Sequence, residues 1–258
     1  MQVKFKLSGE NLDLSRFEVE TIFGKTGTKT GTKRGKFLTL DKRITRESAL
    51  KLIEKSALIK KVYFPDGSTW TPQHSQYRGR HPKDRPAFHP TGMKPKMARV
   101  MVNLSGAKSE IMDPFCGTGA ILIEAAVNGL SVRGSDYDDR MIKRSKINLK
   151  HYKIKPKSLI KLNALELSSK FKKNSVEAII SDPPYGQSST TSNRNIRQLF
   201  KEFIEESYKL LKKNGRLIII VPSKISMNRL IYPKFKKLGQ FDWYVHGGLT
   251  RRFVVLEK

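Results

Sequence analysis

The sequence predicts an α/β protein with a doubly wound sheet, an antiparallel pair of strands at the C-terminal end of that sheet, and a small α+β domain ahead of it. Three observations predict this. From about residue 91, apolar strands alternate with amphipathic helices. His246-Gly247-Gly248-Leu249 separates two strand-like segments and is typical of a hairpin. Residues 1–65 follow the order βαβαβ, which suggests a ferredoxin-like sandwich.

The N-terminal domain, residues 1–65, is expected to contain three strands and two helices. Val3, Phe5 and Leu7 alternate with polar residues like a strand, and Thr45 is a candidate cap for the second helix, with Ser48 as an alternative. After the first strand, the expected elements are a helix over Leu12–Phe23, a strand over Phe37–Leu40, a helix over Arg46–Lys55 and a strand over Leu58–Phe64. Residues 24–36 are rich in Gly, Thr and Lys and contain no acidic residue, so we expect a mobile basic loop there.

Residues 66–90 are expected to form a basic, proline-rich linker. The prolines in this stretch, together with Gly67 and Gly79, make regular structure unfavourable. Its positive charges include Arg78, Arg80, Lys83 and Arg85. Residues 91–258 then form the doubly wound domain.

The doubly wound domain is expected to alternate strands and helices along its length. Its helices are predicted over Pro95–Leu104, Ala120–Asn128, Asp139–Tyr152, Ile196–Leu211 and Ile225–Lys237. Its strands are predicted over residues 110–113, Ser131–Gly134, Leu159–Leu162, Val176–Ser181, Arg216–Val221, Phe241–Val245 and Arg252–Leu256.

Charge is the most informative property of the composition. The chain has 51 Lys and Arg against 23 Asp and Glu, a formal net charge of +28. So large an excess repels itself in the compact state, and the phosphate backbone of a nucleic acid is the partner that best offsets it. The single cysteine, Cys116, excludes an intramolecular disulfide and a cysteine-rich zinc site. With no apolar run of membrane-spanning length and no signal peptide in evidence, a cytoplasmic location is expected.

A glycine-rich turn follows the first predicted strand of the larger domain, over Asp113-Pro114-Phe115-Cys116-Gly117-Thr118-Gly119. Ligands of doubly wound sheets bind at the carboxyl ends of the strands, and glycines let the backbone approach a ligand closely. The carboxylate of Asp113 opposes the phosphates of a dinucleotide but suits an ammonium group, such as the one that S-adenosylmethionine carries. The third glycine of a dinucleotide motif and the Gly-Lys-Ser/Thr of a P-loop are both absent.

Two further polar residues follow the next predicted strands. Asp136 can accept hydrogen bonds from both hydroxyls of a ribose, and Asn163 can bond to the edge of an adenine. Other interpretations stay open, because Asp136 could be a solvated or helix-capping acid and Asn163 a turn residue. The predicted cofactor-binding residues are Asp113, Phe115, Gly117, Gly119, Asp136 and Asn163. No histidine spacing supports a metal site.

The motif Asp182-Pro183-Pro184-Tyr185 follows the apolar strand Val176–Ser181, which puts it at the rim of the same cleft. The exocyclic amine of a nucleobase is a poor nucleophile because its lone pair is delocalised into the ring. A site must therefore accept its hydrogen bonds and hold it in line with the methyl group. Asp182 offers one acceptor, the two prolines fix a backbone carbonyl as a second, and Tyr185 offers a face for stacking. Taken alone, the motif could also be a rigid turn with a packed tyrosine.

These residues resemble the class I, Rossmann-like amino methyltransferases, and among them the Trm11-type tRNA guanosine N2-methyltransferases, which modify guanosine at position ten. The resembling stretches are Arg85–Pro90, Met97–Leu104, Asp113–Gly119 and Asp182–Gly186, with Leu7–Asn11 and Leu14–Arg16 similar to the N-terminal ferredoxin-like domain of that family. The resemblance implies S-adenosylmethionine as cofactor, a guanine exocyclic amine as methyl acceptor and tRNA as partner. Some relatives also use a small zinc-binding activator protein.

The sequence departs from this family in one respect. A tRNA-binding THUMP domain normally separates the ferredoxin-like and catalytic domains, and here only about 20 linker-like residues do so. We therefore expect the basic loop Lys25–Lys36, the linker arginines or a separate RNA-binding chain to contact the tRNA. Two other functions stay open, namely a DNA adenine or cytosine amino methyltransferase and an RNA-binding methyltransferase subunit that is active only with a partner.

Overall fold

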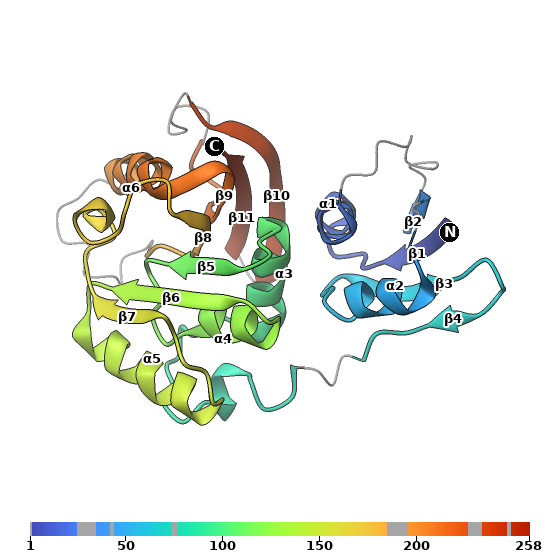
Figure 1. Ribbon diagram of the computed structural model, residues 1–258, viewed down its shortest axis with the longest axis horizontal. Helices are drawn as coiled ribbons and strands as arrows, with labels where there is room; N and C mark the ends of the chain where they lie inside the picture. Colours follow the sequence, from blue (N-terminus) through green and yellow to red (C-terminus); the bar gives the residue numbers. More distant parts are fainter. Residues whose placement is uncertain are drawn as a thin grey trace. The chain divides into compact units, whose positions relative to one another are not determined.

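The computed structural model describes residues 2–24, 35–41, 44–73, 77–184, 196–226, 234–246 and 249–258 (Figure 1). The backbone contacts divide the chain into two units, Met1–Arg78 and Gly79–Lys258. The boundary between them lies inside the stretch 66–90 that the sequence suggests as a linker. Most of the predicted basic loop 24–36 lies outside the described residues.

The N-terminal unit is a four-stranded antiparallel sheet with two helices. Its elements are β1 (Gln2–Leu7), α1 (Leu12–Phe23), β2 (Phe37–Asp41), α2 (Arg46–Ile53), β3 (Ile59–Tyr63) and β4 (Thr69–Trp70). The strand order is β2-β1-β3-β4, and each neighbouring pair is antiparallel. Hence β2 and β3 run parallel to each other on either side of β1. This arrangement is that of the split βαβ unit of a ferredoxin-like sandwich. By contrast, β1 and β2 are antiparallel neighbours. The ferredoxin-like assignment as a whole stays a prediction.

Alternation along the strands builds the core of this unit. Val3, Phe5 and Leu7 of β1 are buried and join apolar residues of α1 and α2 in one cluster, while the residues between them are exposed. Both helices begin at side-chain caps. Asn11 accepts a hydrogen bond of 2.8 Å from the backbone of Leu14, and Thr45 accepts one of 3.2 Å from that of Ser48, which confirms the predicted cap.

The larger unit is a seven-stranded sheet with helices packed against it. Its elements are η2 (Pro82–Asp84), α3 (Pro95–Ser105), β5 (Glu110–Asp113), α4 (Ala120–Val127), β6 (Ser131–Asp136), α5 (Asp139–His151), β7 (Ser158–Lys161), η3 (Leu167–Ser169), β8 (Val176–Ser181), α6 (Ile196–Leu210), β9 (Leu211–Pro222), β10 (Lys236–His246) and β11 (Leu249–Glu257). The strand order is β10-β11-β9-β8-β5-β6-β7. Strands β5 to β9 pair in parallel, and β11 is antiparallel to both β9 and β10. This is the predicted doubly wound, Rossmann-like sheet with an antiparallel pair.

Helix α6 covers one part of this sheet. Its buried residues Phe200, Phe203 and Ile204 pack in one cluster with alternate residues of the central strands, such as Leu217 and Ile219 of β9. Helix α3 packs against α4, and α5 runs alongside β6 and β7 (Figure 1). The central strands β5 and β8 are therefore buried along most of their length, as expected for parallel strands covered by helices.

Two predictions of secondary structure are wrong. The helix predicted over Ile225–Lys237 is contradicted at its described ends, because Ile225 is not helical and Lys236 and Lys237 belong to β10. The stretch 66–90, expected to lack regular structure, contains β4 and the short helix η2. Residues 227–233 of the predicted helix lie outside the described part of the chain.

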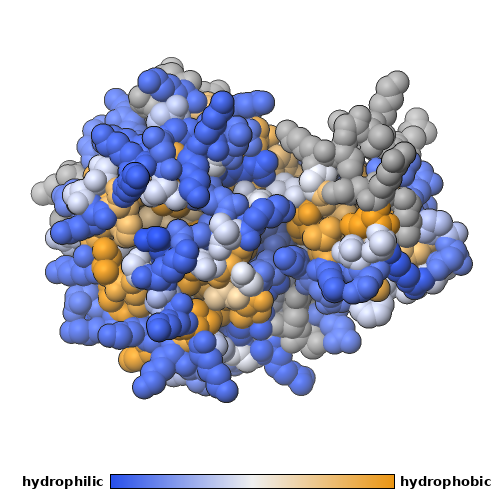
Figure 2. Space-filling model, in the orientation of Figure 1, coloured by the Kyte–Doolittle hydropathy of each residue, from blue (hydrophilic) through white to orange (hydrophobic). Residues whose placement is uncertain are grey.

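Hydrophilic side chains predominate on the face of the molecule drawn in Figure 2, in keeping with the formal net charge of +28. Within the described ranges, no helix combines the length and the apolar character needed to cross a membrane.

Candidate active site

The predicted site residues lie at the carboxyl ends of neighbouring parallel strands. Asp113 ends β5, Asp136 ends β6, and Asp182 follows the last residue of β8. Strands β5 and β8 are neighbours, and the chain leaves them in opposite directions along the sheet, toward β6 and toward β9. The carboxyl side of such a switch point is where doubly wound sheets bind their ligands.

Asp113 is a fully buried acid at this switch point. Only 1% of its surface is exposed, and its Oδ1 accepts hydrogen bonds from the Ser181 hydroxyl at 2.6 Å and from the backbone of Phe115 at 3.1 Å. Burial raises the pKa of Asp113 from 3.8 to about 7; the two hydrogen bonds lower it, and the charges of Asp136 and Asp182 raise it further. The carboxyl group therefore changes its charge near neutral pH.

The turn after β5 has the backbone conformation that its glycines allow. Gly117 and Gly119 have φ angles of +50° and +88°, which side chains on L residues rarely permit. A Cβ on Gly117 would meet no atom within 4 Å, so the space above this residue is open. A Cβ on Gly119 would lie 2.7 Å from the Ser145 hydroxyl of α5, so this glycine is required by packing.

Cys116 lies inside the same turn and is 4% exposed. Burial raises the pKa of its thiol well above the ordinary value, and the charges of Asp113 and Asp136 raise it further. A thiol held in this way stays protonated, so Cys116 is suited to packing inside the turn and not to nucleophilic attack.

Asp136 holds the turn from the neighbouring strand. Its Oδ2 accepts a hydrogen bond of 2.9 Å from the backbone of Gly117, and its Oδ1 accepts one of 2.9 Å from that of Asp138. Burial raises its pKa, although these backbone bonds lower it. The nearby Asp138 caps α5 instead, because its side chain accepts a hydrogen bond of 2.8 Å from the backbone of Arg140. Asp136 is thus the acid at the strand end, with lone pairs left for a ligand.

Three acidic residues gather at the carboxyl ends of β5, β6 and β8. Asp113, Asp136 and Asp182 are close enough for the latter two to raise the pKa of the first. Among the described residues, no Lys or Arg forms an ion pair with Asp113 or Asp136, although the whole chain carries an excess of 28 positive charges. A small cationic ligand would therefore be stabilised here.

Two predicted cofactor residues have other contacts in the structure. The Phe115 ring packs edge-on against Phe203 at 5.0 Å between centroids, so its side chain supports the turn from the core. The Asn163 Oδ1 accepts a hydrogen bond of 3.1 Å from the backbone of Leu165, which closes a turn after β7. This is the turn interpretation of Asn163, and its contact with an adenine stays a prediction.

The predicted catalytic motif begins where β8 ends. Pro183 is buried and Pro184 is half-buried, which fixes the backbone that follows Asp182. The side chain of Asp182 is 20% exposed at the edge of the cleft. Tyr185 lies outside the described residues, so its stacking role stays a prediction.

Two residues of the site were missed by sequence reasoning. Arg251 of β11 donates from Nη1 to Oδ2 of Asp182 at 3.0 Å, and the same nitrogen lies 3.4 Å from the sulfur of Met97. Its side chain is 19% exposed. Ser181, which is fully buried, binds Asp113 from β8. The position of Ser181 next to the motif was a usable signal, whereas Arg251 is 69 residues from Asp182 in the sequence and gave none.

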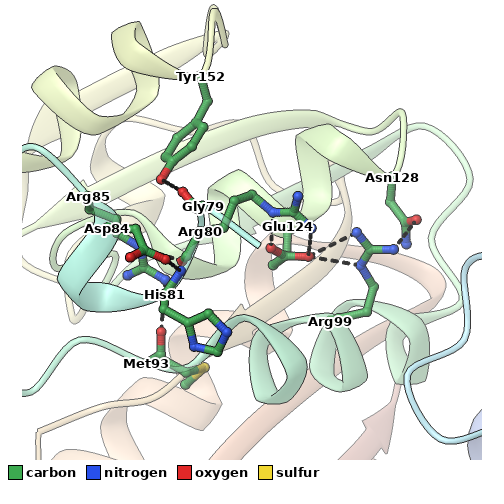
Figure 3. A network of polar contacts seen from close by, with 10 residues as sticks. All are labelled: Gly79, Arg80, His81, Asp84, Arg85, Met93, Arg99, Glu124, Asn128 and Tyr152. Carbon is green, nitrogen blue, oxygen red and sulfur yellow. Dashed lines mark hydrogen bonds and ion pairs between the residues drawn. The ribbon is translucent and has the colours of Figure 1, made fainter. Parts of the chain in front are cut away.

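The arginines of the predicted linker are used inside the larger unit. Glu124 of α4 is fully buried between Arg80, at 2.7 Å, and Arg99 of α3, at 2.9 Å (Figure 3). Arg85 is 4% exposed and donates to the backbone carbonyls of Arg80 and Met93 (Figure 3). The expectation that these two linker arginines contact tRNA is therefore contradicted, because both guanidinium groups are engaged within the protein.

Asn148 of α5 connects the segment after these arginines to the glycine turn. Asn148 of α5 accepts a hydrogen bond of 2.9 Å from the backbone of Ala87 and donates one of 2.9 Å to the carbonyl of Thr118.

In the described part of the chain, no group of three or more His, Cys, Asp or Glu is arranged to hold a metal ion.

Comparisons with known proteins agree with this geometry. Residues 82–251 match the family model described as RMKL-like, methyltransferase domain (UPF0020). The chain is 40% identical over 179 residues to the tRNA (guanine(10)-N2)-dimethyltransferase of Methanothermobacter thermautotrophicus, a match that covers 69% of this chain and 52% of that protein. It is 40% identical over 174 residues to the enzyme of the same name from Pyrococcus abyssi, covering 67% of this chain and 52% of that protein. The chain thus spans about half the length of these curated relatives.

The fold is also that of a solved structure. The crystal structure of TrmN from Thermus thermophilus matches with a TM-score of 0.63 at 16% identity, over 100% of both chains. The family match includes η2, the glycine turn, the Asp-Pro-Pro-Tyr motif and Arg251. This chain belongs to the RMKL-like methyltransferase domain family.

Proposed function

We propose that this chain transfers a methyl group from S-adenosylmethionine to the exocyclic N2 of a guanine in tRNA. The observation that carries the proposal is the cleft at the ends of β5, β6 and β8, where Asp113 and Asp136 have no cationic partner among the described residues and Asp182 is held by Arg251. The guanine and its position 10 come from the names of the relatives that match the larger unit.

The residues of the cleft fit S-adenosylmethionine. Asp113 offers a buried carboxylate for the ammonium group of the methionine part, and the open space above Gly117 lets the ligand lie against the backbone. Asp136 has lone pairs for the two ribose hydroxyls. When bound, S-adenosylmethionine supplies an electrophilic methyl group and leaves as S-adenosylhomocysteine.

The residues after β8 orient the amine. Asp182 accepts a hydrogen bond from the amine, and the buried Pro183 fixes the backbone whose carbonyl is the second acceptor. In the transfer, a bond from the amine nitrogen to the methyl carbon would replace the bond from that carbon to sulfur, and Asp182 would be positioned to accept the proton that the amine releases. The ion pair with Arg251 holds the carboxylate in place, so Asp182 contributes chiefly by orientation.

The proposed function also includes a partner and a location in the cell. The net charge of +28 favours a polyanion, and tRNA is the partner that the names of the relatives point to. We keep the cytoplasm as the proposed location. A small zinc-binding activator protein stays a prediction.

The proposal is tested by incubating the purified chain with methyl-labelled S-adenosylmethionine and an unmodified tRNA transcript, followed by nucleoside analysis. Label in N2-methylguanosine or N2,N2-dimethylguanosine is the expected result, and the two products distinguish one transfer from two. A transcript with inosine in place of the target guanosine is the matched control, because inosine lacks only the exocyclic amine. Label in adenosine or cytidine, or a preference for a DNA oligonucleotide of the same sequence, would contradict the proposal.

A variant separates catalysis from binding. Asp182→Asn keeps the size of the side chain but removes the carboxylate, so turnover should fall strongly while the affinity for S-adenosylhomocysteine stays close to that of the wild type. Equal loss of turnover and of ligand affinity would show instead that Asp182 supports the structure of the cleft.

A further inference from the structure

The N-terminal sheet has one face that no helix covers in its own unit. The side chains of Val3, Phe5 and Leu7 point toward α1 and α2, so the residues between them point to the opposite face. The same alternation on β2 buries Leu38 and Leu40. The residues that reach this opposite face, here called the outer sheet face, are Lys4, Lys6, Phe37, Thr39, Lys61 and Tyr63.

The strand register gathers these residues into one patch. On the central strand β1, Lys6 lies between Phe37 of β2 and Lys61 of β3, and Lys4 lies between Thr39 and Tyr63. The rings of Phe37 and Tyr63 lean toward each other over β1, with centroids 6.2 Å apart and planes tilted by 54°. Two tilted rings thus lie next to each other above the middle of the sheet.

Each ring is accompanied by an ammonium group. The Nζ of Lys4 lies 4.7 Å from the centroid of Phe37, and the Nζ of Lys61 lies 5.5 Å from that of Tyr63. Among the described residues, none of Lys4, Lys6 and Lys61 forms an ion pair with an acid. The acid closest to them along the register is Asp41, opposite Gln2 at the edge of the face. The face therefore presents net positive charge around two rings.

The residues of the outer sheet face are not part of the hydrophobic core of the unit. The core of the unit lies on the other face, and Phe37 keeps 37% of its surface exposed. Apolar surface that stays exposed and is rimmed by polar or charged side chains is a feature of interaction sites. Planar rings between ammonium groups match the two parts of a nucleotide, because the base stacks on the ring and the phosphate lies near the ammonium group.

We infer that the outer sheet face binds unpaired bases of RNA by stacking two of them on Phe37 and Tyr63 while Lys4, Lys6 and Lys61 hold the adjacent phosphates. A duplex hides the faces of its bases, so the face should discriminate in favour of single strands. The inference rests on the proposed function only in naming RNA as the nucleic acid.

The test measures binding by the full chain, without S-adenosylmethionine, to a fluorescein-labelled single-stranded RNA of about ten nucleotides. Phe37→Leu and Tyr63→Leu keep an apolar side chain but remove the stacking plane, so each should weaken binding at least about fivefold. Trp70→Leu is the matched control, because Trp70 is also 37% exposed but pairs with the buried Val62 and so points to the opposite face. This control should bind like the wild type.

A charge series tests the phosphate contacts independently of the rings. Lys4→Gln and Lys61→Gln should each reduce the slope of log affinity against log salt by about 0.7, the value for one phosphate of a single strand. Lys51→Gln on α2, whose side chain is 73% exposed and pairs with Glu47, is the control and should leave the slope unchanged. Thermal unfolding of every variant identifies any that fails to fold.

A measurement on the wild type needs no variant. Photocrosslinking with 4-thiouridine in the same RNA should label peptides that contain Phe37 or Tyr63. The inference is wrong if the two leucine variants bind like Trp70→Leu, if the wild type prefers a duplex of equal length, or if the crosslinks map only to residues 79–258. Methyl transfer assayed on the same variants reports on the proposed function separately, because it reads the product in the nucleoside rather than the affinity for RNA.

Discussion

The hydroxyl of Ser181 donates a hydrogen bond of 2.6 Å to Oδ1 of Asp113. This bond joins the end of β8 to the end of β5, two strands that are neighbours in the sheet. It favours the charged form of a carboxyl group whose pKa burial raises to about 7. Because Asp113 titrates near neutral pH, both the stability of the free chain and the binding of a cationic ligand should depend on pH there.

Asp113→Asn should change how the free energy of unfolding depends on pH. The unfolded chain releases the Asp113 proton at its ordinary pKa of 3.8, whereas the folded chain keeps it until about pH 7. The folded state binds the extra proton in this window, so stability falls as the pH rises through it, by about 4 kcal/mol in total. The variant lacks this loss. We expect chemical denaturation to show that the free energy of unfolding of the variant, relative to that of the wild type, is higher at about pH 8 than at about pH 5.

The control for this measurement is Asp242→Asn. A hydrogen bond with Arg252 lowers the pKa of Asp242. The contribution of Asp242 to stability is therefore complete above pH 3.8 and is lost only as the pH falls below that value. This contribution should not change between about pH 5 and about pH 8. An Asp113→Asn variant that kept the same pH dependence as the wild type would show that another group is responsible.

Binding of S-adenosylhomocysteine should tighten as the pH rises through about 7. The ammonium group of the ligand favours the charged form of Asp113, so binding releases a proton below this pH, and calorimetry in buffers of different ionisation enthalpy measures that proton. Methylthioadenosine, which lacks the amino acid part, is the matched ligand and should bind with little dependence on pH. If both ligands gave the same pH profile, Asp113 would not face the ammonium group.

Arg251→Gln should reduce turnover more than ligand affinity. Without the guanidinium, Asp182 loses the bond that fixes its orientation, and kcat should fall roughly ten- to hundredfold. The dissociation constant of S-adenosylhomocysteine should change little, because Arg251 contacts the motif after β8 rather than the glycine turn. Arg252→Gln on the same strand is the matched control, since Arg252 pairs with Asp242 and not with Asp182. Equal effects of the two substitutions on kcat would assign Arg251 a general role in the sheet.

Glu124→Gln should destabilise the larger unit by about 3–5 kcal/mol, because it leaves the buried Arg99 and Arg80 without their charge partner. Thermal or chemical unfolding measures this loss. Asp139→Asn is the control in the same unit, since its ion pair with Lys143 is exposed and should contribute about 0.5 kcal/mol or less. A loss for Glu124→Gln no larger than the control would mean that the two arginines find other acceptors.

Local patterns were enough to predict most of the sheet. Val176–Ser181 is a buried apolar run between polar segments, and β8 has these bounds in the structure. Asp113 and Asp136 could be assigned to the cleft because each follows a predicted strand, and the carboxyl ends of parallel strands meet at one edge. For the same reason Ser181, next to the motif, lay within reach of a prediction.

Contacts between distant parts of the chain could not be predicted in this way. Lys236 and Lys237 belong to a strand because they pair with Glu257 and Leu256, although the local spacing of apolar residues suggested a helix. Arg80 of the predicted linker is drawn into the larger unit because Glu124, 44 residues further along the chain, accepts its guanidinium group. The partner of Asp182 comes from β11 for a similar reason. In each case a contact between distant parts of the chain, and not the local sequence pattern, determined the structure.

The place of β11 in the sheet ties the chemistry of the site to the step in which β11 inserts between β9 and β10. β11 follows β10 in the chain but lies between β10 and β9. During synthesis, therefore, β10 has no neighbour in this sheet until β11 has emerged and inserted beside β9. Asp182 emerges long before Arg251, so a nascent chain on the ribosome carries its motif without the guanidinium that orients it. Such a chain could fill the cofactor cleft before it was able to orient an acceptor base.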